Sequence, residues 1–225
     1  MIAENVNGIR AKIDAACQRA GRDPGEVTLV CVTKGIAVEN IHKVLESGIK
    51  DIGENRVQEA RIKHQEIGNQ AVWHMVGHLQ TNKVPDALTI FSLIHSLDSV
   101  RLADAINTQA QRLSKIQDVL IQVNISGEDS KYGISPDMVP DFVRSIAGYP
   151  HLRVRGLMGI ARIMTDPEEA RPSFAMLRAV FDKGAAPATG TIRMEHLSMG
   201  MSQDFEVAVE EGSTMVRIGT AIFQD

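Results

Sequence analysis

A lysine stands at the end of an apolar run early in the sequence, in a setting where its amine could do chemistry. The run Val27–Thr33 is mostly β-branched or apolar, and it leads into Lys34 and Gly35. Its length and low polarity predict a strand buried on both faces, which would hold the amine where the apolar interior opens. An amine held in this way can attack an aldehyde. A lysine at a strand end can equally have reached solvent without any such role.

Two segments near the end of the sequence combine glycine with hydroxyl residues. Ser198–Ser202 (Ser-Met-Gly-Met-Ser) precedes a predicted helix and offers backbone N–H groups and two hydroxyls to an anion. Gly219 and Thr220 offer similar donors after another predicted strand. Serine and glycine are also common turn residues, so in either segment they can serve backbone geometry alone. Together the two segments favour a phosphate site.

Arg217 lies two residues before Gly219, so the two residues share one face of a strand. A phosphate cradle opposite a strand-end lysine suits pyridoxal phosphate, with Lys34 forming a Schiff base and Arg217 facing the pyridine nitrogen. Because arginine does not give up its proton, the ring nitrogen would remain an unprotonated acceptor, which disfavours reactions through a fully developed carbanion. An ion pair between Arg217 and an acid on a neighbouring strand is the alternative.

The histidines and cysteines do not form a pattern that is typical of metal ligands. His74 and His78 straddle a predicted strand-to-helix junction, so the pairing of metal ligands one helical turn apart does not apply to them. Cys17 and Cys31 lack any CxxC or Cys/His spacing and are expected to be reduced core thiols of a cytosolic protein. We therefore expect no metal site.

Eight strand-like segments alternate with helical segments along the chain and would position these residues. The strands are predicted at residues 27–34, 51–55, 72–77, 90–97, 118–125, 154–160, 192–198 and 215–219. This alternation predicts a parallel sheet with crossover helices, and eight units favour its closure into a barrel. An amphipathic helix over residues 2–19 precedes the first strand. We therefore predict an α/β fold, a single (β/α)8 TIM-type barrel domain over residues 1–225 with an extra N-terminal helix.

The end of the chain leaves the closure of this barrel open. In such barrels the carboxyl ends of the strands carry the site, and the loops after strands seven and eight commonly hold phosphate. Only Ile222–Asp225 and two preceding residues follow the eighth predicted strand. The last outer helix is therefore either missing or supplied by the N-terminal helix, and the sequence does not show how the barrel closes after Phe223.

Composition and charge narrow the class of protein. Hydrophobic residues make up 44% of the chain and charged residues 23%, the balance of an ordinary soluble globular protein. A net charge of -4 and a pI of about 6.0 give no basic excess for binding nucleic acid or an anionic membrane. No apolar window of membrane-spanning length and no signal peptide is present, so we expect a cytoplasmic protein. No heptad pattern or oversized apolar stripe is found, and a monomer is the default expectation.

The sequence also resembles a known family over nearly its whole length. The stretches that carry the resemblance are Val32–Lys34, Gly53–Glu59, His74–Lys83, Gln122–Ser126, Ser130–Gly133, Arg155–Met158, Leu197–Asp204 and Gly212–Phe223. They are similar, in the same order, to motifs of the pyridoxal phosphate homeostasis protein family. The resemblance implies a barrel like the N-terminal domain of bacterial alanine racemase.

The resemblance further implies a cofactor, a set of residues and a role. The residues that it places at pyridoxal phosphate are Lys34, Asn55, Met158, Ser198, Gly200, Ser202, Arg217, Gly219 and Thr220. Lys34 would carry the cofactor, Arg217 would face the pyridine nitrogen, and Asn55 and Met158 would line the ring. The implied role is that of a carrier or regulator of the intracellular cofactor pool, which affects amino-acid and keto-acid balance. Apoenzymes that need the cofactor are the candidate protein partners.

Two enzymatic functions stay open beside this role. A low-activity amino-acid racemase would need an acid or base on each face of the α-carbon, for which Lys34 and Tyr132 are the candidates. A phosphosugar enzyme would need a carboxylate base at a strand end. Glu54 is the candidate there, and this function would leave Lys34 without a task.

Overall fold

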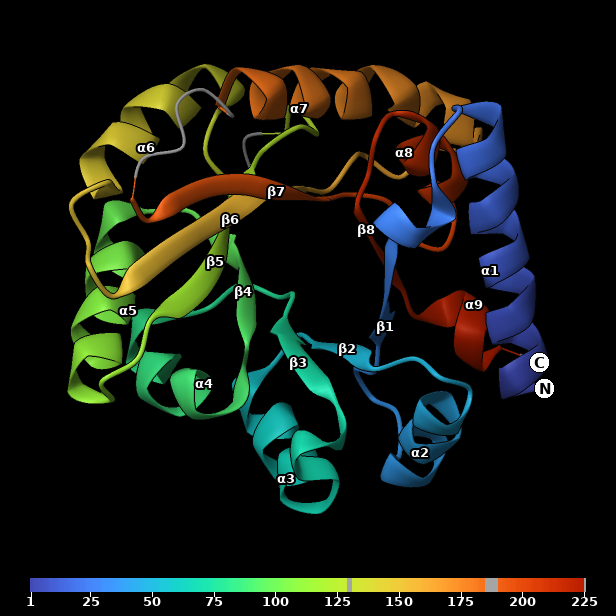
Figure 1. Ribbon diagram of the computed structural model, residues 1–225, viewed down its shortest axis with the longest axis horizontal. Helices are drawn as coiled ribbons and strands as arrows, with labels where there is room; N and C mark the ends of the chain where they lie inside the picture. Colours follow the sequence, from blue (N-terminus) through green and yellow to red (C-terminus); the bar gives the residue numbers. More distant parts are fainter. Residues whose placement is uncertain (129–130, 185–189, 225) are drawn as a thin grey trace.

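The structure, a computed structural model, describes residues 1–128, 131–184 and 190–224 and contains a closed barrel of eight parallel strands. The strands are β1 Thr28–Val32, β2 Asp51–Glu54, β3 Val72–Met75, β4 Leu93–Leu97, β5 Gln117–Val123, β6 Leu152–Gly159, β7 Ile192–Ser198 and β8 Met215–Ile218. They follow one another around the barrel in chain order, and β8 pairs with β1 to close the ring (Figure 1). This confirms the predicted α/β barrel of the TIM type.

Helices surround the ring of strands. They are α1 Ile2–Arg19, α2 Val38–Glu46, α3 Val57–Ile67, α4 Val84–Ile90, α5 Val100–Arg112, α6 Val139–Ile146, α7 Arg171–Gly184, α8 Phe205–Glu210 and α9 Thr220–Phe223. Short 3-10 turns lie at Pro24–Glu26, Gly68–Gln70, Thr81–Lys83, Pro136–Met138 and Pro167–Ala170. Within the described ranges, no helix is long and apolar enough to cross a bilayer.

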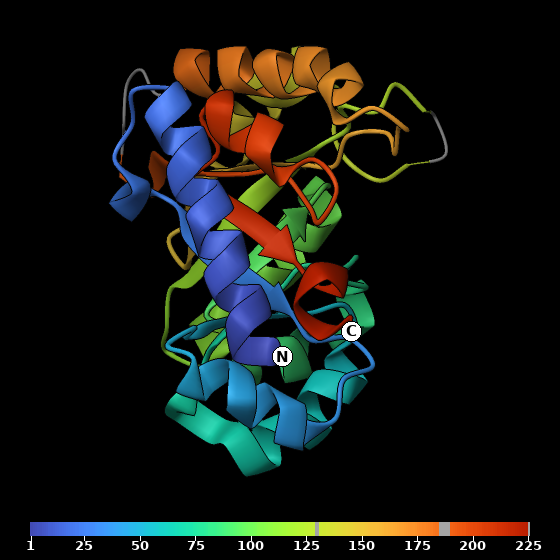
Figure 2. The same ribbon diagram turned by 90° about the vertical axis from the view of Figure 1, so that its right-hand side faces the viewer.

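The N-terminal helix α1 covers the part of the barrel that lacks a long last helix. Its apolar positions recur at helical spacing, and Val6, Ile9 and Ile13 are buried. It packs along α8 and the short α9, and Figure 2 shows the two chain ends close together. The amide of Asn5 donates to the carbonyl oxygens of Ile222 (3.1 Å) and Gln224 (2.9 Å). The N-terminal helix therefore occupies the outer position between α8 and α2, which was one of the two options that the sequence left open.

The predicted strand ends shift by a few residues, for identifiable reasons. β1 ends at Val32, and Lys34 and Gly35 lie in a turn. Only Val30 and Cys31 of β1 are buried, because the ends of the strand open to cavities at the two ends of the barrel. The expectation of full burial on both faces was therefore wrong. The expected strand over residues 90–97 begins at 93, because α4 uses part of an apolar run that suits either a buried helix or a strand.

Candidate functional site

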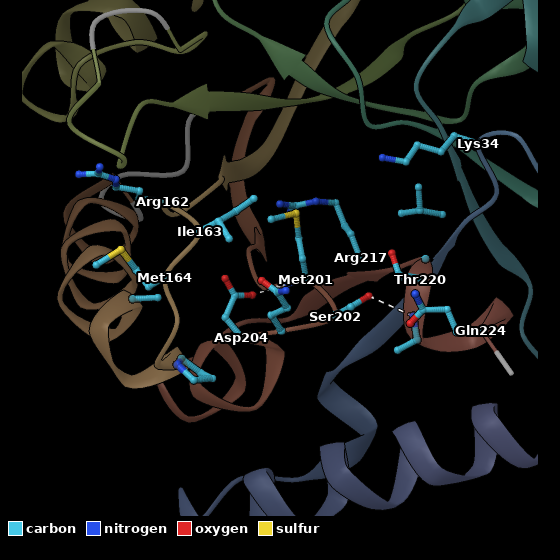
Figure 3. A pocket seen from close by; sticks show the side chains of 16 residues that line it. Lys34, Arg162, Ile163, Met164, Met201, Ser202, Asp204, Arg217, Thr220 and Gln224 are labelled. Carbon is cyan, nitrogen blue, oxygen red and sulfur yellow. Dashed lines mark hydrogen bonds between the residues drawn. The ribbon is translucent and has the colours of Figure 1, made fainter.

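A cavity of about 530 Å³ opens at the carboxyl ends of β1, β6, β7 and β8, a volume typical of small-molecule sites (Figure 3). Five of the predicted site residues line it, namely Lys34, Ser202, Arg217, Gly219 and Thr220. They come from segments separated by up to 186 positions, counted from 34 to 220, which the closure of β8 onto β1 brings together. The barrel thus unites the amine, the guanidinium and the glycine–hydroxyl segments that were predicted to act together.

Lys34 enters the cavity from the turn after β1. It is exposed, and in Figure 3 its side chain extends into the same cavity as the guanidinium of Arg217. Thr33, one residue earlier, is completely buried and donates through Oγ1 to Glu54 Oε1 (2.6 Å). The N–H of Gly35, one residue later, donates to Glu59 Oε1 (2.5 Å). The backbone on both sides of the lysine is therefore anchored while its amine stays accessible.

The anchoring groups converge on Lys63 of α3. Its Nζ donates to Glu54 Oε1 (2.7 Å), Glu59 Oε1 (2.6 Å) and the carbonyl oxygen of Thr33 (2.6 Å), and the side chain is only 7% exposed. Burial raises the pKa of Glu54, an effect that the hydrogen bonds from Lys63 and Thr33 offset only in part. The sequence offered one signal for this network, the spacing of Glu59 and Lys63 by one helical turn. Glu54, the base that a phosphosugar enzyme would need, is therefore committed to a structural network.

Arg217 of β8 is buried and held by two hydrogen bonds. It donates to Ser198 Oγ (2.6 Å) and to the carbonyl oxygen of Gly159 (3.0 Å). Burial lowers the pKa of Arg217 to about 10, and the nearby carboxylate of Asp204 opposes this shift. The group therefore stays charged at neutral pH. Its closest partners are a hydroxyl and a carbonyl rather than the strand-neighbour acid of the alternative interpretation.

The two glycine–hydroxyl segments meet at the wall of the cavity. Ser202 Oγ accepts a hydrogen bond from the N–H of Ala221 (3.4 Å), which links the loop after β7 to the start of α9 (Figure 3). Gly219 lies against β1, because a Cβ there would be 3.1 Å from the carbonyl oxygen of Val32. Hydroxyl and backbone donors of Ser202 and Thr220 thus lie at one end of the cavity.

The loop after β7 depends on two residues. Gly200 was among the predicted site residues, whereas Asp204 was not. Gly200 has a φ of +92°, and a Cβ there would lie 2.6 Å from the Cβ of Ala208. Asp204 Oδ1 accepts from the N–H of Met201 (2.6 Å), which fixes the turn into α8. Burial raises the pKa of Asp204. Asp204 follows Met201 by three residues, a spacing at which a side chain can bind a backbone N–H at the start of a helix. This spacing is the signal that could have identified it.

Four predicted residues lie outside the wall of the cavity. Ser198 is completely buried behind Arg217, and Gly200 supports the same loop from within. Met158 is completely buried in the barrel interior, in a small cluster with Leu93, Leu120 and Met215. Asn55 is half-buried just after β2. A contact between these four side chains and a ligand therefore stays a prediction.

The loop after β6 forms the wall opposite Lys34. Arg162, Ile163 and Met164 line the cavity, and Ile163 is 73% exposed. A neighbouring cavity of about 200 Å³ shares Arg162, Ile163 and Met201 with the first and is also lined by Tyr132. The ring of Tyr132 stacks on His78, with 4.0 Å between the ring centroids. In the part of the chain that the structure describes, no group of three or more His, Cys, Asp or Glu side chains is arranged to hold a metal ion.

The chain is similar to known proteins over nearly its whole length. Residues 5–225 match the family model described as alanine racemase, N-terminal domain. The pyridoxal phosphate homeostasis protein of Aquifex aeolicus (strain VF5) is 41% identical over 221 residues, which make up 98% of this chain and 96% of that relative. The resemblance in the sequence motifs is thereby confirmed.

Two solved structures are similar in fold and in sequence. An unknown protein from Bifidobacterium adolescentis has a TM-score of 0.94 and 35% identity, with 99% of this chain and 94% of that chain covered. PipY of Synechococcus elongatus PCC7942, solved with PLP bound, has a TM-score of 0.86 and 31% identity, with 100% of each chain covered. The chain therefore belongs to the pyridoxal phosphate homeostasis protein family, whose barrel corresponds to the N-terminal domain of alanine racemase.

Proposed function

We propose that this protein holds pyridoxal phosphate covalently on Lys34 and takes part in the homeostasis of that cofactor. The observation that carries the proposal is the convergence of Lys34, Arg217 and the donors around Ser202 and Thr220 on one cavity. The relatives are named for pyridoxal phosphate homeostasis, and the PipY structure holds the cofactor itself. Function and cofactor thus rest on family membership together with the chemistry of the cavity.

The residues present fit the chemical groups of pyridoxal phosphate. The amine of Lys34 would condense with the aldehyde, forming a C=N bond and releasing water. Arg217 would donate to the ring nitrogen, while Ser202, Gly219 and Thr220 would hold the phosphate. When bound, the cofactor would supply an electron sink for amino-acid chemistry. A permanently charged Arg217 at the ring nitrogen would weaken this sink, which suits holding the cofactor better than turning over amino acids with it.

The remaining predicted residues have supporting places in the proposal. Ser198 would hold Arg217 from behind, and Gly200 would shape the phosphate loop. Asn55 and Met158 would flank the ring where the cavity meets the barrel interior. Their contribution can be measured separately from that of Lys34, because none of the four is a covalent anchor.

The proposed setting is the cytoplasm, where apoenzymes that require the cofactor would receive it. Cys17 and Cys31 support a reducing compartment because both are buried and free. The proposed state is a monomer, which sedimentation of the purified chain would test.

A low-activity racemase is the alternative function. It would require Tyr132 as the second acid or base, yet Tyr132 lines the neighbouring cavity and stacks on His78. The geometry therefore favours a holder of the cofactor. Incubation of loaded protein with L-alanine, followed by chiral chromatography, distinguishes the two, since turnover of about 1 s⁻¹ or more is typical of an enzyme.

The covalent anchor is tested with a lysine variant and a matched control. Loaded wild-type protein should be yellow, with a visible absorption band that Lys34→Ala abolishes. Lys43→Ala, which removes an exposed lysine on α2, should keep the band. An unchanged band in Lys34→Ala would contradict the proposal.

A further inference from the structure

A chain of polar side chains crosses the interior of the barrel and ends at Arg217. Asp51 Oδ1 lies 3.0 Å from His74 Nε2, and His74 Nδ1 lies 2.9 Å from His95 Nε2. His95 Nδ1 lies 3.1 Å from Ser198 Oγ, which accepts from Arg217 at 2.6 Å. The strands β4 and β7 are not neighbours in the sheet, so the contact between His95 and Ser198 passes through the barrel interior.

When both imidazoles are neutral, the groups at the two ends of this row of side chains allow only one set of hydrogen-bond directions. Arg217 can only donate, and the carboxylate of Asp51 can only accept. In the neutral arrangement Ser198, which accepts from Arg217, donates its own proton to Nδ1 of His95. His95 then carries its proton on Nε2 and donates to Nδ1 of His74, which in turn donates from Nε2–H to Asp51. In this arrangement each ring carries its one proton on Nε2, and every ring nitrogen has a hydrogen-bond partner.

The surroundings of His95 support a neutral ring. The ring is completely buried, and it is faced by His74 on β3, Arg217 on β8 and His196 on β7. Burial is the main reason that the pKa of His95 lies well below its ordinary value, and the three neighbouring groups act in the same direction. A positive charge on His95 would lie close to the permanent charge of Arg217.

This row of hydrogen-bonded side chains begins with Asp51, at the end of the barrel opposite the cavity that Lys34 lines. Asp51 is the first residue of β2, its side chain is 28% exposed, and it lines a separate cavity of about 480 Å³. The connection therefore runs from a solvent-accessible carboxylate to the buried guanidinium. The function proposed above gives no task to Asp51, His74 or His95.

We propose that Asp51, His74, His95 and Ser198 form a positioning relay that fixes the place and the hydrogen-bond direction of Arg217 at the cofactor cavity. The proposal rests on the function proposed above, because Arg217 matters there as the donor to the ring nitrogen. Arg217 uses two of its N–H groups to bind Ser198 and Gly159. Its other N–H groups remain available to a ligand in the cavity. Without an acceptor at His95, the Ser198 hydroxyl is free to rotate and Arg217 loses a partner of fixed direction.

The tautomers can be tested on the unloaded full-length protein. Nitrogen-15 spectra of protein labelled at histidine should show His74 and His95 as neutral rings with the proton on Nε2. Single His→Asn variants assign the two signals. A ring with its proton on Nδ1, or a doubly protonated His95 at neutral pH, would overturn the relay independently of any cofactor.

The effect on the cofactor is tested with two variants of similar shape. His95→Asn retains an acceptor near the position of Nδ1, whereas His95→Leu removes it and adds apolar bulk. The relay predicts that His95→Leu raises the dissociation constant for pyridoxal phosphate about tenfold and shifts the visible band, while His95→Asn stays close to wild type. A purely packing role predicts the opposite order, because leucine suits an apolar interior better than asparagine. The pair His74→Leu and His74→Asn should follow the same order.

The outcomes separate the two proposals. Wild-type protein without a band that depends on Lys34 refutes the proposed function. Wild-type protein with the band, combined with leucine variants that bind as tightly as asparagine variants, refutes the relay alone. If His95→Leu does not fold, the His74 pair and the nitrogen-15 spectra decide the question.

Discussion

Lys34 owes its position to side chains that do not line the cavity. Thr33 and Gly35 are bonded to Glu54, Glu59 and Lys63, while the lysine between them projects freely. An amine that must react has to be accessible and also fixed in place, and these two requirements are met here by different residues. The buried ion pair is therefore expected to matter more for the position of Lys34 than for stability, since replacing such a pair by apolar residues is often neutral.

Breaking this pair from one side should nevertheless be costly. Lys63→Met leaves the carboxylate of Glu54, which is completely buried, without its charged partner. We expect the free energy of unfolding in urea to fall by about 3–5 kcal/mol. The double variant Lys63→Met/Glu54→Gln serves as the matched control and should recover much of the loss. Equal losses in the single and double variants would show that the pair is not coupled.

The neutral His95 makes stability depend on pH. The unfolded chain binds a proton at this residue below about pH 6.5, whereas the folded chain does so only below a much lower pKa. The contribution of His95 is therefore fully present above about pH 6.5 and is lost as the pH falls toward the folded-state pKa, by at most about 1.4 kcal/mol per pH unit. Urea unfolding at several pH values would measure the slope. His95→Asn should flatten it, and identical slopes would contradict the assignment.

The loop between β7 and α8 contributes both to the stability of the fold and to the shape of the cavity. Gly200 accepts a hydrogen bond from the N–H of Arg217 (3.0 Å) through its carbonyl oxygen, and Ser202 of the same loop bonds to Ala221. The loop thus holds both the arginine strand and the start of α9. A change in its backbone is expected to disturb the cavity as well as the fold.

Gly200→Ala tests this loop. A positive φ and a contact of 2.6 Å with Ala208 both oppose a side chain there. We expect a loss of about 2–4 kcal/mol of unfolding free energy and weaker cofactor binding. The control is Gly8→Ala in α1, where a Cβ meets no atom within 4 Å and alanine should stabilise by about 0.5–1 kcal/mol. Two glycine variants with effects of the same sign and size would argue against the steric explanation.

The sequence predicted the order and type of the elements more accurately than the direction of individual side chains. Alternation of apolar runs identifies the eight strands, and barrel closure then brings Lys34 beside Arg217. Whether Ser198 faces the ligand or Arg217 depends on register and interior packing, which one-dimensional patterns do not encode. His95 and the contacts of Lys63 with Thr33 and Glu54 were missed for the same reason, because the partners come from other elements.

For the whole molecule, the first helix and the last residues form one structural unit. α1 packs on α8 and α9, and α9 begins at Thr220 on the wall of the cavity. A short terminal helix of four residues has little stability of its own. The position of Thr220 and Gln224 at the cavity is therefore set by the other end of the chain.

Asn5 is the residue through which this dependence can be measured. Its amide donates to the carbonyl oxygens of Ile222 and Gln224, so Asn5→Ala removes two hydrogen bonds at the end of α9. We expect a loss of about 1–2 kcal/mol of unfolding free energy. Because α9 carries Thr220, we also expect a higher dissociation constant for pyridoxal phosphate. Asn7→Ala, at an exposed position on the same helix, should leave the dissociation constant unchanged and stabilise the fold slightly, because alanine has the higher helix propensity. If Asn5→Ala destabilised the fold without weakening cofactor binding, the closure of the chain ends would serve stability alone, and the cavity would be independent of α1.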